Sequence, residues 1–217
     1  MPAVHLWAFL LQNPKIIVKI YKIYLKKGDT VPKVNHGRPN SKLNVATKSP
    51  REDRELAVYD LLDSLNISYD QIDHQPADTM EGCIEVEKDL GVAICKNLFL
   101  TNRQQTDFYL LLTPGNKVFK TKFLSKELGI ARLSFASANK MLEYLNVVPG
   151  AVTVFGLMND KEKHVQLVID EDILKDEYLG AHPCVYTACT KIKTKDLLDK
   201  IIPAMHHEAK IIHLETE

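Results

Sequence analysis

The chain has 217 residues, of which 45% are hydrophobic and 26% are charged, so it is long and apolar enough for one sizeable globular domain. The formal net charge of zero conceals a division: residues 1–50 carry nine Lys or Arg and one acid, and residues 51–217 carry 19 basic and 27 acidic groups. A basic arm suits a phosphate-rich partner or a membrane surface, but the acidic body excludes a broad nucleic-acid footprint.

The cysteines and the first residues predict a cytoplasmic protein. Four cysteines in a chain of this length do not make a disulfide framework. The apolar stretch at 4–11 has no basic region before it and no small-residue cleavage site after it, so we do not expect secretion. It is also too short to span a bilayer, so we expect no membrane association through a span.

Residues 1–49 are expected to be a basic, poorly ordered N-terminal extension, because lysines alternate with Ile, Val and Tyr and then give way to a linker of Gly, Pro, Asn and Ser. A membrane-surface or RNA-binding arm is the alternative. The folded domain is expected to occupy residues 50–217.

Element signals follow one another regularly from there. The first half predicts a helix up to Asn66, a strand at 67–73, a helix that stops at Gly91, and a hairpin of 94–100 with 107–112. A short helix (121–129), a strand around 132–136 and a helix through 139–145 come next.

A second hairpin is predicted from AVTVFGL (151–157) and HVQLVID (164–170), with Asn159 and Asp160 at its turn. A helix from Thr194 to Ile202 and a closing strand around 209–215 complete the chain. Helices and hairpins are interspersed without a strict βαβ alternation, which predicts an α+β (mixed α/β) fold with a mixed, largely antiparallel sheet flanked by helices.

Standard cofactor and nucleophile motifs are absent, and we expect no cofactor. A zinc site could be drawn from the nearby His182, Cys184, Cys189 and the His206–His207 pair. However, the two cysteines have no second pair at ligand spacing, so they are interpreted as core residues and no metal ligand is assigned.

Three places are not easily explained by packing. Lys96 stands in the apolar strand ICKNLFL, where it either carries its ammonium back to water or awaits an anionic ligand. Gly150 and Gly156 lie at the two ends of the segment 150–156. These glycines indicate either a close approach of the backbone to a ligand or merely a Pro-Gly turn where a strand begins. His182 precedes a proline in GAHPC (180–184), where it is either a turn residue or a pocket residue.

Together with their surroundings, these three places resemble the prolyl-tRNA editing family, which comprises YbaK-like and prolyl-tRNA synthetase-associated domains. The matching segments are CKNLFL, DFYLLL, GAVTVFGL, LVID, and GAHP followed by VYTA, and REDRELAVYDLLDSLNISYDQIDH is similar to the start of the freestanding members. The similar region, residues 51–214, covers about three quarters of the chain and implies the fold of that family.

The resemblance implies a trans-editing hydrolase that deacylates mischarged tRNA, with Ala-tRNA(Pro) as the expected substrate, by positioning the substrate so that its own ribose hydroxyl helps activate water. Lys96 would be the catalytic residue, at the phosphate or ribose of the terminal adenosine. The implied substrate-binding residues are His182 and the glycine-loop residues Gly150, Ala151, Val152, Thr153, Val154, Phe155 and Gly156. The implied partners are the tRNA 3′ end and, as a further candidate, prolyl-tRNA synthetase, and a monomer is expected.

Two positions depart from the family pattern. Val154 stands where the glycine loop of the family has proline, and Tyr186 stands where many members have asparagine. Both are expected to affect amino-acid selectivity. A pocket that selects by size alone discriminates one methylene by only about 1 to 3 kcal/mol, so a small change in its shape matters. The alternatives are therefore a Cys-tRNA(Pro) deacylase, or a catalytically silent module of the same fold that binds a tRNA end or an amino acid.

Overall fold

A computed structural model describes residues 51–75 and 80–215, with the backbone alone for residues 80–83. The expected N-terminal extension lies outside the described residues. The elements follow in this order: α3 (Asp53–Ser64), β1 (Asp70–Asp73), α4 (Met80–Leu90), β2 (Lys96–Thr101), β3 (Phe108–Thr113), α5 (Thr121–Leu128), β4 (Ser134–Phe135), α6 (Ala138–Leu145), the 3₁₀ helix η1 (Val154–Asn159), β5 (Val165–Asp170), the 3₁₀ helix η2 (Glu171–Lys175), β6 (Tyr178–Ala181), β7 (Ala188–Lys193), α7 (Thr194–Asp196), the π-helical η3 (Leu197–Ile201), α8 (Ile202–Ala204) and β8 (Ala209–Ile212).

The larger sheet of the described chain has five strands in the order β4-β2-β3-β5-β8 and is mixed. The hairpin of β2 and β3 is antiparallel, as predicted, and pairs Lys96 with Thr113 at its open end. β5 joins β3 in parallel, and β8 joins β5 in parallel. The parallel strands β3 and β5 therefore end at the same edge of the sheet, where β2 begins.

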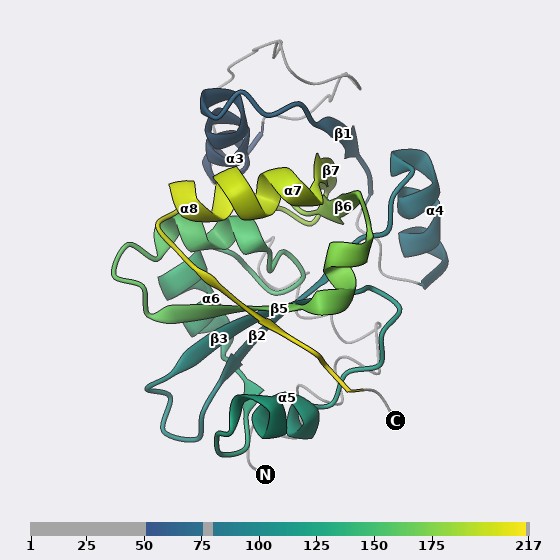
Figure 1. The fold of residues 1–217 in the computed structure, drawn as a ribbon. Helices are drawn as coiled ribbons and strands as arrows, with labels where there is room; N and C mark the ends of the chain where they lie inside the picture. Colours follow the sequence, from purple (N-terminus) through teal and green to yellow (C-terminus); the bar gives the residue numbers. More distant parts are fainter. Residues whose placement is uncertain (1–50, 76–79, 216–217) are drawn as a thin grey trace.

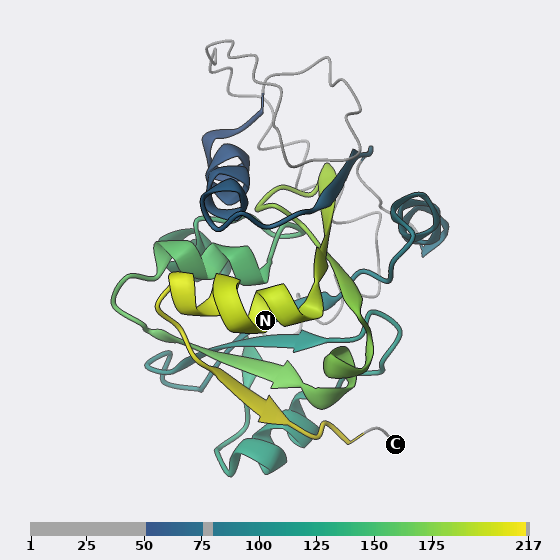
Figure 2. The same ribbon diagram turned by 45° about the horizontal axis from the view of Figure 1, so that its top comes forward.

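Helices cover both faces of this sheet (Figure 1). On one face, alternate residues such as Phe99, Leu110 and Leu167 are buried with α3, α6, η1 and the continuous α7–η3–α8 segment. On the other face, Leu100, Leu111 and Val168 pack with Leu124 of α5. The turned view keeps α5 on its own side of the sheet (Figure 2), so the five-stranded sheet is the middle layer of the domain.

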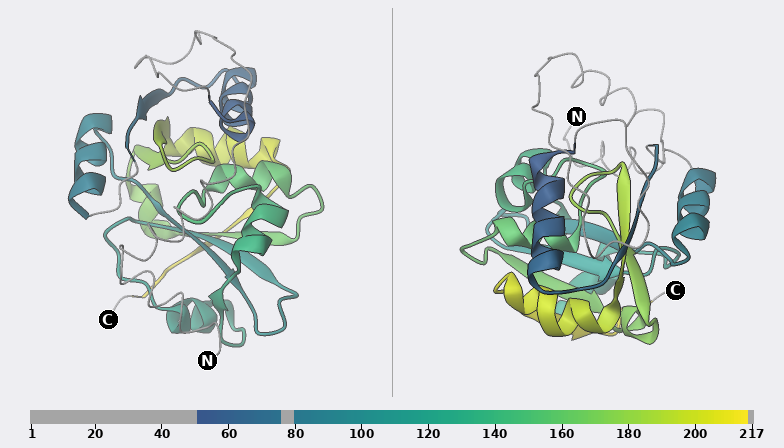
Figure 3. Two further views of the ribbon diagram at one scale, coloured as in Figure 1. Left: turned by 180° about the vertical axis from the view of Figure 1, so that it is seen from behind. Right: turned by 90° about the horizontal axis from the view of Figure 1, so that it is seen from above.

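A smaller antiparallel sheet has the order β1-β7-β6 and lies with α3 and α4 beyond the α7–α8 segment (Figure 3). Its middle strand, β7, pairs Cys189 with Ile72 of β1, and Thr190 with Ala181 of β6. The two sheets are linked by a parallel bridge between Ile94 and Gly180. Two hydrogen bonds secure this link: the Cys95 amide donates to the Gly180 carbonyl at 3.0 Å, and the Gly180 amide donates to the Ala93 carbonyl at 2.9 Å.

The predicted hairpin of 151–157 with 164–170 is wrong. The first segment is not a strand: Thr153 caps the 3₁₀ helix η1 by accepting a hydrogen bond from the Phe155 amide. β5 pairs instead with β3 and β8. The apolar run could not reveal this, because a short buried run has no period that separates a strand from a helix.

The predicted α+β class is confirmed, as are the first hairpin and the helices that end near Asn66, Gly91 and Gly129. Gly91 and Gly129 adopt a φ of +68°, the left-handed conformation that ends helices. None of the helices in the described part of the chain is long and apolar enough to cross a membrane.

Candidate active site at the edge of the mixed sheet

Polar side chains gather where β2 begins and β3 and β5 end. Thr113, the partner of Lys96 across the hairpin, donates a hydrogen bond from its hydroxyl to Asp170 at 2.8 Å. Asp170 is fully buried at the end of β5, and one of its carboxylate oxygens also accepts from the Asp172 amide. A buried carboxylate needs such donors and a counter-charge to remain ionised.

Lys117 supplies that counter-charge. Its ammonium lies 2.8 Å from a carboxylate oxygen of Asp170 and 2.6 Å from one of Asp172, and its side chain is 9% exposed. Burial alone would lower the pKa of Lys117, but the hydrogen bonds to both carboxylates outweigh it and raise this pKa. The hydrogen bonds from Lys117 and Lys175 lower the pKa of Asp172 to about 2. Lys117 is thus a fixed structural cation.

Lys96 differs from Lys117 because it has no acidic partner among the described residues. Its ammonium donates a hydrogen bond of 2.9 Å to the main-chain carbonyl of Lys117. Burial lowers the pKa of Lys96, since nothing anionic offsets the loss of water. An ammonium has three N–H donors, so this carbonyl leaves donor capacity for an anionic ligand.

The turn between β3 and α5 sets the position of the carbonyl that Lys96 contacts. The Lys117 amide donates to the Pro114 carbonyl at 3.1 Å and closes the turn. Gly115 packs directly on the strand before Lys96: a Cβ atom added at Gly115 would lie 2.4 Å from the Ile94 carbonyl oxygen. Only glycine allows this approach, so the turn and the base of Lys96 are held together.

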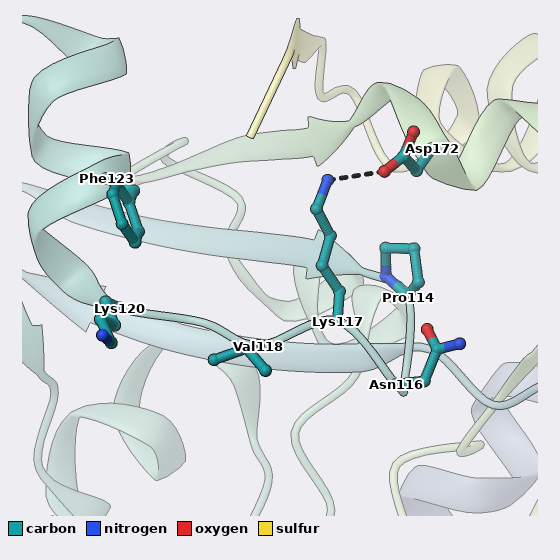
Figure 4. A pocket seen from close by; sticks show the side chains of 7 residues that line it. All are labelled: Pro114, Asn116, Lys117, Val118, Lys120, Phe123 and Asp172. Atoms are coloured by element: carbon teal, nitrogen blue, oxygen red, sulfur yellow. Dashed lines mark hydrogen bonds and ion pairs between the residues drawn. The ribbon is translucent and has the colours of Figure 1, made fainter. Parts of the chain in front are cut away.

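A cavity of about 500 Å³ opens beside this turn (Figure 4). Its apolar side chains include Phe123 and the strongly exposed Val118, and its cationic ones are Lys117 and Lys120. Its lining residues are Pro114, Asn116, Lys117, Val118, Lys120, Phe123 and Asp172. An open concavity with apolar surface is suited to a flat base.

His182 follows β6 of the smaller sheet. It lies two residues after Gly180, whose bridge to Ile94 joins that sheet to the segment leading into β2. Nδ1 of His182 lies 2.9 Å from the Ala188 carbonyl oxygen, and because that oxygen only accepts, Nδ1 carries the proton. Burial lowers the pKa of His182, which favours the neutral ring.

The glycine loop buries its side chains in the core. Ala151, Thr153, Val154 and Phe155 are fully buried, and Val152 is partly buried against the same core. Gly150 has a φ of +89° and open space where a Cβ would lie. By contrast, a Cβ at Gly156 would lie 2.9 Å from that of Leu145, so this glycine serves the packing of η1 on α6 and does not mark a strand bulge.

The two residues that depart from the family pattern, Val154 and Tyr186, both belong to the main apolar cluster or pack against it. Val154 begins η1, and Tyr186 is partly buried against the apolar cluster that also contains Ala151 and Cys184. Cys184, two residues after His182, has a φ of +60°, a conformation that non-glycine residues adopt at a cost. Burial raises its pKa to about 12, which keeps the thiol protonated.

The zinc set considered from the sequence is not assembled. His207 is buried against Asp160, with Nε2 at 3.2 Å from a carboxylate oxygen and Nδ1 at 2.8 Å from the Met205 carbonyl oxygen. The structure instead brings His74 to His182 and Cys189. Thr113, Lys117 and Asp170 were not predicted from the sequence. The signal for two of them was an acid that ends an apolar strand and a lysine that follows a Pro-Gly turn.

The fold and this edge define the class of protein: a mixed-sheet α+β domain with a half-buried lysine at the sheet edge, whose ammonium contacts the carbonyl of Lys117. Residues 74–200 match the family model described as an aminoacyl-tRNA editing domain. The chain belongs to this family.

Named relatives agree with the family model. The "Prolyl-tRNA editing protein ProX" of Acetoanaerobium sticklandii is 32% identical over 162 residues, which are 75% of this chain and 98% of that protein. The "Prolyl-tRNA synthetase associated domain-containing protein 1" of Danio rerio is 29% identical over 71% of this chain and 84% of its own length. A crystal structure described as a candidate trans-editing enzyme for prolyl tRNA synthetase shares the fold, with a TM-score of 0.57, 16% identity, and coverage of 75% of this chain and 98% of that one.

Proposed function

We propose that the chain is a trans-acting aminoacyl-tRNA deacylase whose substrate is tRNA for proline mischarged with alanine. The observation that carries the proposal is the half-buried ammonium of Lys96, which meets a carbonyl and no carboxylate among the described residues. A desolvated cation of this kind is a site for an anion. Membership of the editing family and the similarity to a prolyl-tRNA editing protein support the tRNA 3′ end as that anion.

In this proposal the protein positions the ester and does not attack it. Lys96 binds the phosphate or ribose of the terminal adenosine, and Phe123 with Val118 offers an apolar surface for its base. The ribose hydroxyl of the substrate helps to activate water, while the backbone at Gly150 holds the aminoacyl group and His182 orients it. Positioning and fixed charges of this kind supply several kcal/mol of barrier reduction, on the order of a hundredfold or more per well-placed donor.

The acidic body of the domain agrees with a narrow contact to the single-stranded end of the tRNA. Affinity beyond that contact would come from residues 1–49 or from prolyl-tRNA synthetase as a partner. A monomer working in the cytoplasm without a cofactor suffices for this reaction.

The test is deacylation of alanyl-tRNA(Pro) by the purified full chain, with cysteinyl-tRNA(Pro) and prolyl-tRNA(Pro) run beside it. We expect loss of alanine, sparing of proline, and a fall of about a hundredfold or more in kcat/KM for Lys96→Met. Lys126→Met is the matched control, since that lysine is 71% exposed on α5 and pairs with Glu215.

Preference for cysteine would establish the alternative substrate. Hydrolysis of none of the three esters, with tRNA binding retained, would leave a silent binding module. Equal activity of Lys96→Met and the wild type would refute the role given to this lysine.

A further inference from the structure

We propose that His74, His182 and Cys189 form a zinc site with one open coordination position. The three residues come from all parts of the smaller sheet: Cys189 lies in the central strand β7, His74 follows β1, and His182 follows β6. One ligand atom from each lies within 4.8 Å of the others.

The distances match those that a zinc ion imposes on its ligands. Sγ of Cys189 lies 3.4 Å from Nε2 of His74 and 3.3 Å from Nδ1 of His182. Zinc–sulfur bonds of about 2.3 Å and zinc–nitrogen bonds of about 2.0 Å at the tetrahedral angle separate the ligand atoms by about 3.5 Å. The two sulfur–nitrogen distances therefore need little change on binding, whereas the two imidazole nitrogens, within 4.8 Å of each other, must reach about 3.3 Å.

The tautomer of His74 is already suited to coordination. Its Nδ1 lies 2.8 Å from the Gln75 carbonyl oxygen, which can only accept, so Nδ1 carries the proton and Nε2 presents its lone pair to Cys189. A histidine ligand held by a carbonyl at its other nitrogen is the usual outer arrangement of a zinc site. The backbone also fixes the approach, because the His74 amide donates to the Thr187 carbonyl at 2.9 Å.

His182 must change its partner on binding. Its Nδ1–H donates to the Ala188 carbonyl in the metal-free arrangement, so coordination moves that proton to Nε2 and turns the Nδ1 lone pair to the metal. Cys189 loses its thiol proton to solvent, so each zinc bound releases one proton. Two imidazoles and one thiolate hold the ion, and the fourth position takes water.

The surroundings distinguish this cluster from a set of exposed side chains. Cys189 is fully buried and packs with Ile72, Val86 and Leu90, whereas both histidines are partly exposed. The sulfur therefore sits at the floor of the cluster and the imidazoles at its open side. Because the thiolate lies deepest and the imidazoles lie nearer the surface, an ion can enter from the side of the histidines.

The first experiment titrates the chelator-treated full chain with Co²⁺, and zinc then displaces the cobalt. We expect one equivalent to bind, with the absorption of tetrahedral cobalt and sulfur-to-cobalt charge transfer. Cys189→Ser should remove the charge transfer, and His74→Gln should weaken binding at least about tenfold. Absence of the charge-transfer band in the wild type, or equal binding by Cys189→Ser, would overturn the site.

Two controls match the chemistry of the substitutions. Cys95→Ser removes a buried thiol outside the cluster, and His213→Gln removes an exposed imidazole that pairs with Glu171. Both should bind cobalt as the wild type does. Circular dichroism of each variant checks the fold, and His74→Gln keeps the test usable if Cys189→Ser does not fold, because His74 lies at a partly exposed strand end.

A second readout rests on the proposed function, since His182 belongs to both sites. Fixing its ring with zinc should change the rate of alanyl-tRNA(Pro) deacylation in the wild type and not in Cys189→Ser. If the cobalt spectrum appears but the rate does not respond, the metal site stands and the role of His182 in deacylation falls. If the enzyme is inactive throughout, the spectrum still decides the metal site.

Discussion

The ammonium of Lys96 donates its hydrogen bond to the carbonyl of Lys117, while the ammonium of Lys117 is held by Asp170 and Asp172. Two lysines 21 residues apart thus have opposite roles. The charge of Lys117 is neutralised by the buried Asp170 and the partly exposed Asp172, and the ammonium of Lys96 contacts only a main-chain carbonyl among the described residues.

Gly115→Ala should both destabilise the protein and impair deacylation. The added Cβ would lie 2.4 Å from the Ile94 carbonyl oxygen, so the turn must shift, at about 1 to 3 kcal/mol of unfolding free energy. The shift moves the carbonyl that positions Lys96, so kcat/KM per folded molecule should also fall. Denaturant titration and the deacylation assay measure the two effects.

Gly129→Ala is the control for Gly115→Ala. It strains a residue with φ of +68°, but nothing lies within 4 Å of the added Cβ. It should cost about 1 to 2 kcal/mol and leave kcat/KM unchanged. Equal activity of both variants would contradict the positioning role of the turn.

Asp170→Asn should cost about 3 kcal/mol of unfolding free energy. It leaves the ammonium of Lys117, 9% exposed, with only Asp172 as its counter-charge. Combining it with Lys117→Met should recover part of the loss, because no uncompensated charge then remains buried. A double variant that loses the sum of the two single effects would show that the pair does not act as a unit.

Acid should reveal the contribution of Asp172. Its pKa in the folded protein is lowered to about 2 from an ordinary 3.8, so the stability it contributes is complete above the ordinary value and is lost as the pH falls toward 2. The difference in unfolding free energy between the wild type and Asp172→Asn should be constant from pH 7 to 5 and narrow below about pH 4. Urea titrations at each pH measure it, and a gap that stays constant down to pH 3 would be inconsistent with the ion pairs described.

Gly156→Ala tests whether this glycine serves packing or a ligand. The new Cβ would lie 2.9 Å from Cβ of Leu145 and 3.1 Å from its carbonyl oxygen, so stability should fall by about 1 to 3 kcal/mol. Deacylation per folded molecule should not change. Lost activity at full stability would instead favour a close backbone approach to the substrate.

The sequence was most informative where periodicity and stop signals agree. The β2–β3 hairpin and the helices ending at Gly91 and Gly129 follow from local alternation and from glycine in the left-handed region. The segment around Val154 could not be read in this way, because its side chains are buried on all sides and tertiary packing against α6 decides its conformation.

Lys96 was the residue of the sheet-edge site that the sequence could reveal. Lys96 stands out because a lysine breaks an apolar face, but Asp170 and Lys117 are 53 residues apart and meet only through the parallel pairing of β3 and β5. The meeting of His74 with Cys189, 115 residues away, likewise depends on the pairing of β1 with β7. Long-range pairings of this kind leave no local pattern in a single sequence.

The pairing of β1 with β7 also has a kinetic consequence. The smaller sheet cannot form until residues near both ends of the domain are present, and β5 gains its outer neighbour only from β8. Such non-local contacts slow folding, because the chain loses the entropy of loop closure before strand pairing stabilises it. During synthesis, β1 therefore has no strand partner until β7 has left the ribosome. In that period the unpaired backbone groups at its edge are open to chaperone binding.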